Sequence, residues 1–133
     1  MNTTLDHIQH HKALLADLLK TCHASVPFNT ERHNKIDSDF LDSLTQLSQQ
    51  VSTADEYLYT GQQLLTYIIS HYPHLTPAIN RDLLWYFGGD CLHYMTDEEI
   101  QQYQQLDELL FEVNESGQSL NYVEAKAKIF KLH

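Results

Sequence analysis

The sequence predicts an all-α fold: one domain, residues 1–133, in which about six helices pack as an irregular antiparallel bundle. Apolar residues recur at spacings of three and four along most of the longer segments. Helix-capping patterns, in which a small polar residue precedes an acidic one by three positions, stand before several of these segments. No segment alternates apolar and polar residues over more than a few positions, as a half-buried strand would, and no repeat or linker divides the chain.

Two helices are expected in the first part of the chain. The apolar spacing predicts one over residues 5–23 and, after a loop, a second over residues 38–51. The second is expected to begin inside an Asp-Ser-Asp run, because these side chains accept hydrogen bonds from the free N–H groups of a first helical turn. Leu15, Leu18 and Cys22 lie on the apolar face of the first helix.

A third helix is expected over residues 53–72 and is the central helix of the predicted bundle. Thr53 and Glu56 have the spacing of a capping box at its start, and Pro73 ends it. Gly61 lies on its apolar face, where glycine costs about 1 kcal/mol relative to alanine. We therefore expect another helix to pack closely against Gly61.

Residues 83–95 hold the only tryptophan, the only Gly-Gly pair and the densest aromatic run of the chain. Thr76 followed by Pro77 predicts a helix start, and a fourth helix is expected over residues 78–87. Gly88 is expected to end it, because glycine adopts the left-handed conformation without steric cost. A short connector should lead from there to the next helix.

Two further helices are expected in the C-terminal part. Thr96 and Glu99 have capping-box spacing and predict a helix over residues 97–113. Asn121, three residues before a glutamate, predicts the start of a last short helix that continues to about residue 130.

Charge excludes several classes of partner. The chain has 18 acidic and 8 basic residues, and residues 36–125 contain fifteen acidic residues but a single basic one, Arg81. Direct binding to nucleic-acid phosphates or to an anionic membrane needs clustered lysine and arginine, so neither is expected. The acidic surface favours solubility or a basic partner. The polar N-terminus lacks the basic and apolar regions of a signal peptide, and no apolar run is long enough to span a membrane. Cys22 and Cys91 are expected to be reduced thiols. We therefore expect a cytoplasmic protein.

The Gly-Gly turn is the first candidate site, because side chains that leave a helix end can converge on a ligand. The candidate binding corner comprises Trp85, Gly88, Gly89, Asp90, Cys91 and His93. The alternative, which the residue types favour, is a packed helix corner in which the cysteine is a small buried apolar residue. A thiol sensor at Cys91 is a narrower alternative that the acidic run after it opposes.

Metal binding is the second candidate chemistry. His7, His10 and His11 have helical i,i+3 and i,i+4 spacings, which can place two imidazoles on one divalent metal. Cys91 and His93 could bind zinc as thiolate and imidazole, although no paired ligand spacing accompanies them. The favoured alternative for the three histidines is a solvated polar helix face. No cofactor is therefore predicted, with zinc or another divalent metal kept as the alternative.

One motif links the chain to known proteins. Residues 85–95, which read WYFGGDCLHYM, and the Asp-Glu-Glu-Ile run after them resemble a motif of small uncharacterised all-α proteins from gammaproteobacteria. The resemblance implies an all-α cytosolic protein, and it would extend to about residue 130. It supplies no activity, so no functional residue is carried over from it.

The sequence thus favours a non-enzymatic helical interaction or regulatory module that acts through a protein partner or by self-association. No catalytic residue is predicted, because no GxSxG elbow or phosphate loop occurs. The alternative is a metal- or small-molecule-binding protein or enzyme with its site at the Gly-Gly corner. A docking surface could be formed by exposed aromatic residues, although most of them are more typical of a core: Trp85, Tyr86, Phe87, Tyr94 and Tyr103.

Overall fold

The computed structural model describes residues 3–31, 34–118 and 120–131, and within these ranges all regular structure is helical, which confirms the all-α prediction. Six α-helices and two 3₁₀-helices follow one another in the described ranges: α1 (Thr3–His23), α2 (Lys35–Gln49), α3 (Asp55–His71), η1 (Pro73–Ala78), α4 (Arg81–Phe87), η2 (Gly89–Tyr94), α5 (Asp97–Ser116) and α6 (Tyr122–Phe130).

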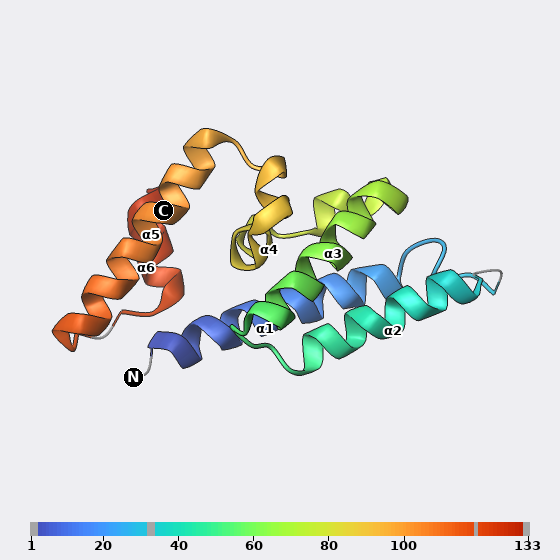
Figure 1. The fold of residues 1–133 in the computed structure, drawn as a ribbon, viewed down its shortest axis with the longest axis horizontal. Helices are drawn as coiled ribbons and strands as arrows, with labels where there is room; N and C mark the ends of the chain where they lie inside the picture. The colour runs from blue at the N-terminus through green and yellow to red at the C-terminus, as the bar shows by residue number, and fades with distance from the viewer. Residues whose placement is uncertain (1–2, 32–33, 119, 132–133) are drawn as a thin grey trace.

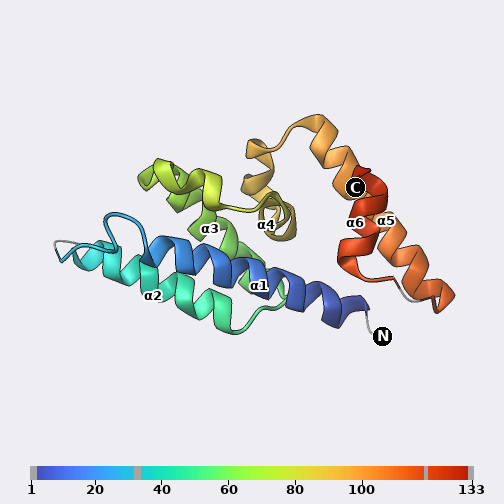
Figure 2. The ribbon, with the colours of Figure 1, turned by 180° about the vertical axis from the view of Figure 1, so that it is seen from behind.

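The helices form a three-helix body with a helical hairpin at one end. The helices α1 and α2 lie side by side and α3 packs against α2, while α5 and α6 form a hairpin (Figure 1). The view from behind shows this hairpin beside the N-terminal half of α1 (Figure 2). The short α4 packs on both α1 and α3, and it therefore lies where the body meets the hairpin.

The core runs through both parts of the molecule. In the body it is built from the apolar faces that the sequence predicts, and Leu15, Leu18, Leu44 and Leu65 are fully buried. The hairpin contributes Leu106, which is also fully buried. The apolar stripes of the long helices therefore all face one continuous core.

The predicted starts of α2, α3 and α4 are corrected. The helix α2 begins at Lys35, three residues before the expected Ser38, because the side chain of Asn34 accepts a hydrogen bond from the backbone N–H of Asp37 at 2.9 Å. The Asp37 carboxylate in turn accepts from the N–H of Asn34, and the two residues complete a capping box.

The helix α3 begins at Asp55 without the side-chain cap that was expected from Thr53. Ala54 is the N-cap residue and offers no side-chain acceptor. The hydroxyl of Ser52 accepts a hydrogen bond from the N–H of Ala54 at 3.0 Å, so a serine turn leads into the helix.

The helix expected over residues 78–87 is divided. Pro77 lies inside η1, the extended backbone of Ile79 interrupts the helical path, and α4 begins only after Asn80. The side chain of Asn80 accepts from the N–H of Asp82 at 2.8 Å and so provides the cap that was assigned to Thr76. The expected connector after α4 is itself the 3₁₀-helix η2.

The C-terminal helix starts are confirmed. Thr96 and Glu99 form the reciprocal capping box at the start of α5, and Asn121 accepts from the N–H of Glu124 at the start of α6. The helix α5 continues to Ser116, one turn beyond the expected end.

The close approach expected at Gly61 is confirmed, and the neighbour is Phe87. A Cβ atom built on Gly61 would lie 2.1 Å from ring carbons of Phe87. The aromatic ring therefore lies directly on the backbone of α3, and only glycine leaves room for it.

We expect Gly61→Ala to lower the free energy of unfolding by about 1 to 3 kcal/mol, although alanine is the better helix former, because the new methyl group overlaps the Phe87 ring. Chemical denaturation measures the loss. Ser70→Ala, at an exposed position of the same helix, is the control and should leave stability nearly unchanged. Equal stability of Gly61→Ala and the wild type would show that the ring contact is not restrictive.

Candidate functional site

The Gly-Gly corner is a packed helix junction. Gly88 has a φ of 66° and ends α4 with its N–H bonded to the carbonyl of Leu84. A Cβ atom on Gly89 would lie 2.4 Å from the Gln62 side-chain oxygen. The Gln62 amide also donates to the carbonyl of Phe87 at 2.9 Å, so the corner is closed by a side chain of α3.

The polar residues of this corner do not form one ligand set. Cys91 is fully buried, whereas Asp90 and His93 are exposed. Trp85 is half-buried, and its indole N–H donates to the Asp107 carboxylate at 3.1 Å on α5. Within the described ranges, no group of three histidine, cysteine or acidic residues is placed to hold a metal ion.

Both cysteines are free and buried. Burial raises the pKa of the Cys22 thiol to about 11 and that of the Cys91 thiol to about 11. At neutral pH both thiols are protonated and shielded, which opposes the thiol-sensor alternative because the thiolate is the reactive species.

The sequence favours a solvated helix face for the three histidines of α1, and this expectation is wrong. His11 is fully buried, and His7 and His10 are half-buried. All three rings surround Tyr122 of α6, with centroid distances of 5.1 Å for His7, 4.3 Å for His10 and 5.2 Å for His11. The carboxylate of Asp6 accepts the backbone N–H of Tyr122 at 2.7 Å, so the first turns of α1 hold the start of α6.

A buried carboxylate joins this histidine face to three other helices. Asp82 of α4 is 2% exposed and accepts hydrogen bonds from His10 Nε2 at 2.9 Å and from Tyr103 Oη of α5 at 2.5 Å. The ammonium group of Lys126 on α6 lies 2.6 Å from the same carboxylate. We call these four residues the Asp82 cluster: His10, Asp82, Tyr103 and Lys126.

Electrostatics fixes the protonation states in the Asp82 cluster. Burial alone would raise the pKa of the Asp82 carboxyl, but the hydrogen bonds from His10, Lys126 and Tyr103 outweigh burial and hold this pKa below its usual range. Burial and the hydrogen bond to Asp82 raise the pKa of Tyr103. Asp82 is therefore ionised and Tyr103 protonated at neutral pH.

Beside the Asp82 cluster lie two buried polar atoms without a hydrogen-bond partner in the described structure: Nε2 of His11 and the hydroxyl of Tyr122. His11 Nδ1 lies 2.7 Å from the carbonyl of His7, so Nδ1 carries the proton and Nε2 the lone pair. Burial lowers the pKa of His11 to about 3, and the imidazole is neutral at pH 7.

The Asp82 cluster has the composition of an acid–base site but the geometry of a structural junction. A carboxylate that orients a histidine is a feature of general-base catalysis. Here, however, the same carboxylate also accepts from a tyrosine and a lysine. Across the described ranges, no serine, threonine or cysteine side chain is hydrogen-bonded to His10 that could serve as a nucleophile.

An open groove lies between α2 and α3, away from the Asp82 cluster. It consists of two hollows of about 280 Å³ and 440 Å³ that share Ser43, and we call it the α2–α3 groove. Its lining residues come from α2, α3 and the segment between them: Ile36, Asp39, Phe40, Ser43, Gln46, Leu47, Gln50, Ser52, Ala54, Glu56, Tyr57, Thr60, Gln63, Leu64 and Tyr67.

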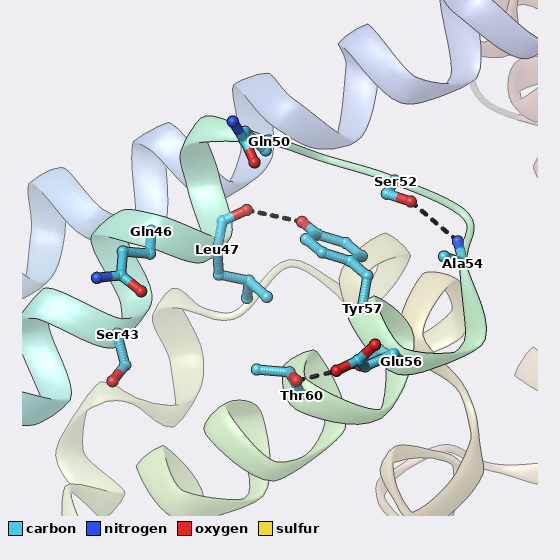
Figure 3. A pocket seen from close by; sticks show the side chains of 9 residues that line it. All are labelled: Ser43, Gln46, Leu47, Gln50, Ser52, Ala54, Glu56, Tyr57 and Thr60. Atoms are coloured by element: carbon cyan, nitrogen blue, oxygen red, sulfur yellow. Dashed lines mark hydrogen bonds between the residues drawn. The ribbon is translucent and has the colours of Figure 1, made fainter.

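The groove combines an apolar floor with a polar rim. Figure 3 shows the larger hollow, where Tyr57 of α3 projects towards α2 and donates its hydroxyl proton to the carbonyl of Leu47 at 2.7 Å. In the smaller hollow Ile36 is 63% exposed. Ile36 lies at this hollow together with Phe40, Leu64 and Tyr67, so the exposed isoleucine belongs to an apolar surface shared by α2 and α3.

The five aromatic residues that the sequence offered as a possible docking surface do not form one. Phe87 and Tyr103 are buried, and Trp85 and Tyr86 are half-buried. Only Tyr94 of the five is exposed. Most of these aromatic residues are therefore core residues, as their composition favoured, and the exposed apolar surface lies elsewhere.

The fold and its surfaces define the class of protein: an all-α helical protein with a polar junction around one buried carboxylate and an open interhelical groove. None of the described helices is both long and apolar enough to cross a membrane. Residues 3–133 match the family model described as PA2817-like, and the chain belongs to this family. No curated protein and no solved structure matches the chain.

We expect Asp82→Asn to lower the free energy of unfolding by about 2 kcal/mol, because the half-buried Lys126 would lose its countercharge and the hydrogen bonds from His10 and Tyr103 would no longer end on an ionised carboxylate. Asp90→Asn removes the same charge at an exposed position and should change stability by less than about 0.5 kcal/mol. Denaturant unfolding at pH 7 measures both. Similar losses in the two variants would contradict a central role for Asp82.

Stability should also fall on acidification. The pKa of His11 is about 3 in the folded chain and about 6.5 when unfolded, so the unfolded state binds more protons as the pH drops from 6.5 towards 3. We expect His11→Gln to reduce the slope of unfolding free energy against pH by about 1.4 kcal/mol per pH unit between pH 6 and 4. The matched variant His93→Gln, at an exposed position, should keep the wild-type slope, and identical slopes in all three proteins would refute the assignment.

Proposed function

We propose that the protein is a non-enzymatic, cytoplasmic helical interaction module that binds a protein partner through the α2–α3 groove. The observation that carries the proposal is the groove itself, an elongated hollow with an apolar floor and an exposed isoleucine at one end. Grooves between helices are used for protein recognition by several unrelated helical folds. The free, buried state of Cys22 and Cys91 fits a reducing compartment.

The geometry of the Asp82 cluster supports the non-enzymatic part of the proposal. Its carboxylate is 2% exposed and already accepts from three donors, whereas a catalytic group must reach a substrate. The α2–α3 groove is open to solvent, and apart from the two carboxylates Asp39 and Glu56 its lining side chains are uncharged polar or apolar. Such a surface is suited to binding a macromolecule without transforming it.

Site-specific photo-crosslinking in the native cells tests the proposal. Ser43 is exposed and lines both hollows, so a photoreactive phenylalanine analogue at this position should give a discrete adduct with another protein chain. The same analogue at Glu108, an exposed position of α5, is the control. Absence of an adduct at Ser43, or the same adduct at both positions, would refute binding at the groove.

The mass of the adduct separates the two kinds of partner. An adduct of twice the mass of the chain would identify self-association, and any other mass would identify a different protein. Both results agree with an interaction module, and they differ in the occupant of the groove.

A further inference from the structure

We propose that the occupant of the α2–α3 groove is a basic amphipathic α-helix of a partner protein. This inference rests on the proposed function and adds the chemical class of the partner. It is carried by three properties of the groove: its length, the spacing of its apolar hollows and the charge of its rim.

The groove has the length of a short helix. Its lining runs from Ile36, near the start of α2, to Gln50, directly after the end of this helix, and α2 has 15 residues. At about 1.5 Å per residue this corresponds to about 22 Å, or four helical turns. A helix placed along the seam would pack against α2 and α3 together, in the same manner as helices pack within a bundle.

The two hollows have the spacing of anchors on one face of a helix. Phe40 lies at the smaller hollow and Leu47 at the larger one, seven residues apart on α2. Seven residues are two turns, or about 10.5 Å, which equals the distance between positions i and i+7 of a partner helix. Two apolar side chains at i and i+7 could therefore fill both hollows at once, with further contacts at i+3 and i+4 along the seam.

The smaller hollow provides the more exposed apolar surface. Ile36 and Tyr67 stand at opposite sides of this hollow, on α2 and α3, with Leu64 beside Tyr67. Ile36 is 63% exposed, whereas Tyr67 and Leu64 are half-buried. Burying this isoleucine against a partner is therefore the main apolar gain that the groove offers.

Charge selects a basic partner. The segment from residue 36 to residue 80 contains five carboxylates and neither lysine nor arginine. Two of these carboxylates line the groove, Asp39 at the smaller hollow and Glu56 at the larger one, and both are exposed. Lys35 precedes this segment and Arg81 follows it. Lys35 is paired with Asp39 at 3.3 Å in an exposed contact that solvent screens, and Arg81 is paired with Glu99 of α5.

The binding of designed peptides to the full-length protein tests the inference. The first probe is a fluorescent 16-residue amphipathic peptide with leucines on one helix face and lysines flanking that face. The second peptide has glutamates in place of the lysines. The third peptide is a scrambled version of the first. We expect the lysine peptide to bind at least tenfold more tightly than the other two, and more weakly as salt is added. Equal binding of the lysine and glutamate peptides, or of the scrambled peptide, would overturn the inference.

Matched variants locate the binding. The double variant Asp39→Asn/Glu56→Gln should weaken binding of the lysine peptide about fivefold. The control variant Glu108→Gln/Glu112→Gln changes the net charge by the same amount at exposed positions of α5 and should not affect binding. Ile36→Ser should weaken it about tenfold without changing the melting temperature, since this side chain is largely exposed. Equal effects of the two charge variants would overturn the inference.

The outcomes separate this inference from the proposed function. If a protein crosslinks at Ser43 but the lysine peptide shows no selective binding, the proposed interaction module is supported and the inference of a basic helical partner is refuted. A homodimer that dissociates on Ser43→Arg substitution would make a second copy the occupant and also refute it. Absence of any adduct at Ser43 would refute the function on which the inference rests.

Discussion

The structure depends on one ionised carboxylate that is withdrawn from water. Asp82 accepts hydrogen bonds from side chains of helices that are far apart in the sequence, and its partner His10 is 72 residues away. Because Tyr103 and Lys126 belong to the two helices of the hairpin, the same carboxylate fixes the hairpin to the body. Apolar contacts alone tolerate sliding, whereas hydrogen bonds to one buried charge define both the distance and the direction of each partner.

The all-α fold could be predicted from the sequence, whereas the Asp82 cluster at its centre could not. The helix starts at Thr96 and Asn121 follow from local patterns, because a cap and the N–H groups it satisfies lie within three residues of each other. The three histidines of α1 have the same spacing whether their face meets water or another helix. Asp82 reads as an ordinary acidic residue in the first turn of a helix, and nothing local indicates that Lys126 neutralises it.

The Gly-Gly corner shows how an unusual composition can indicate packing instead of chemistry. Glycines and aromatic residues are dense there because backbones and rings approach one another closely: Phe87 lies on Gly61, and Gln62 lies on Gly89. The sequence predicted the contact at Gly61 from the cost of a glycine within a helix. It could not distinguish a tight corner from a ligand site at Cys91, because that distinction depends on the burial of each side chain.

The groove lies on α2 and α3, whereas the Asp82 cluster joins α1, α4, α5 and α6, and the two share no residue. Substitutions in one should therefore add independently to substitutions in the other. This separation has an evolutionary consequence. Members of the family can exchange exposed side chains such as Ile36 and Gln46 without approaching the limit of their stability. Under the proposed function, partner choice can therefore diverge among relatives while the scaffold stays constant.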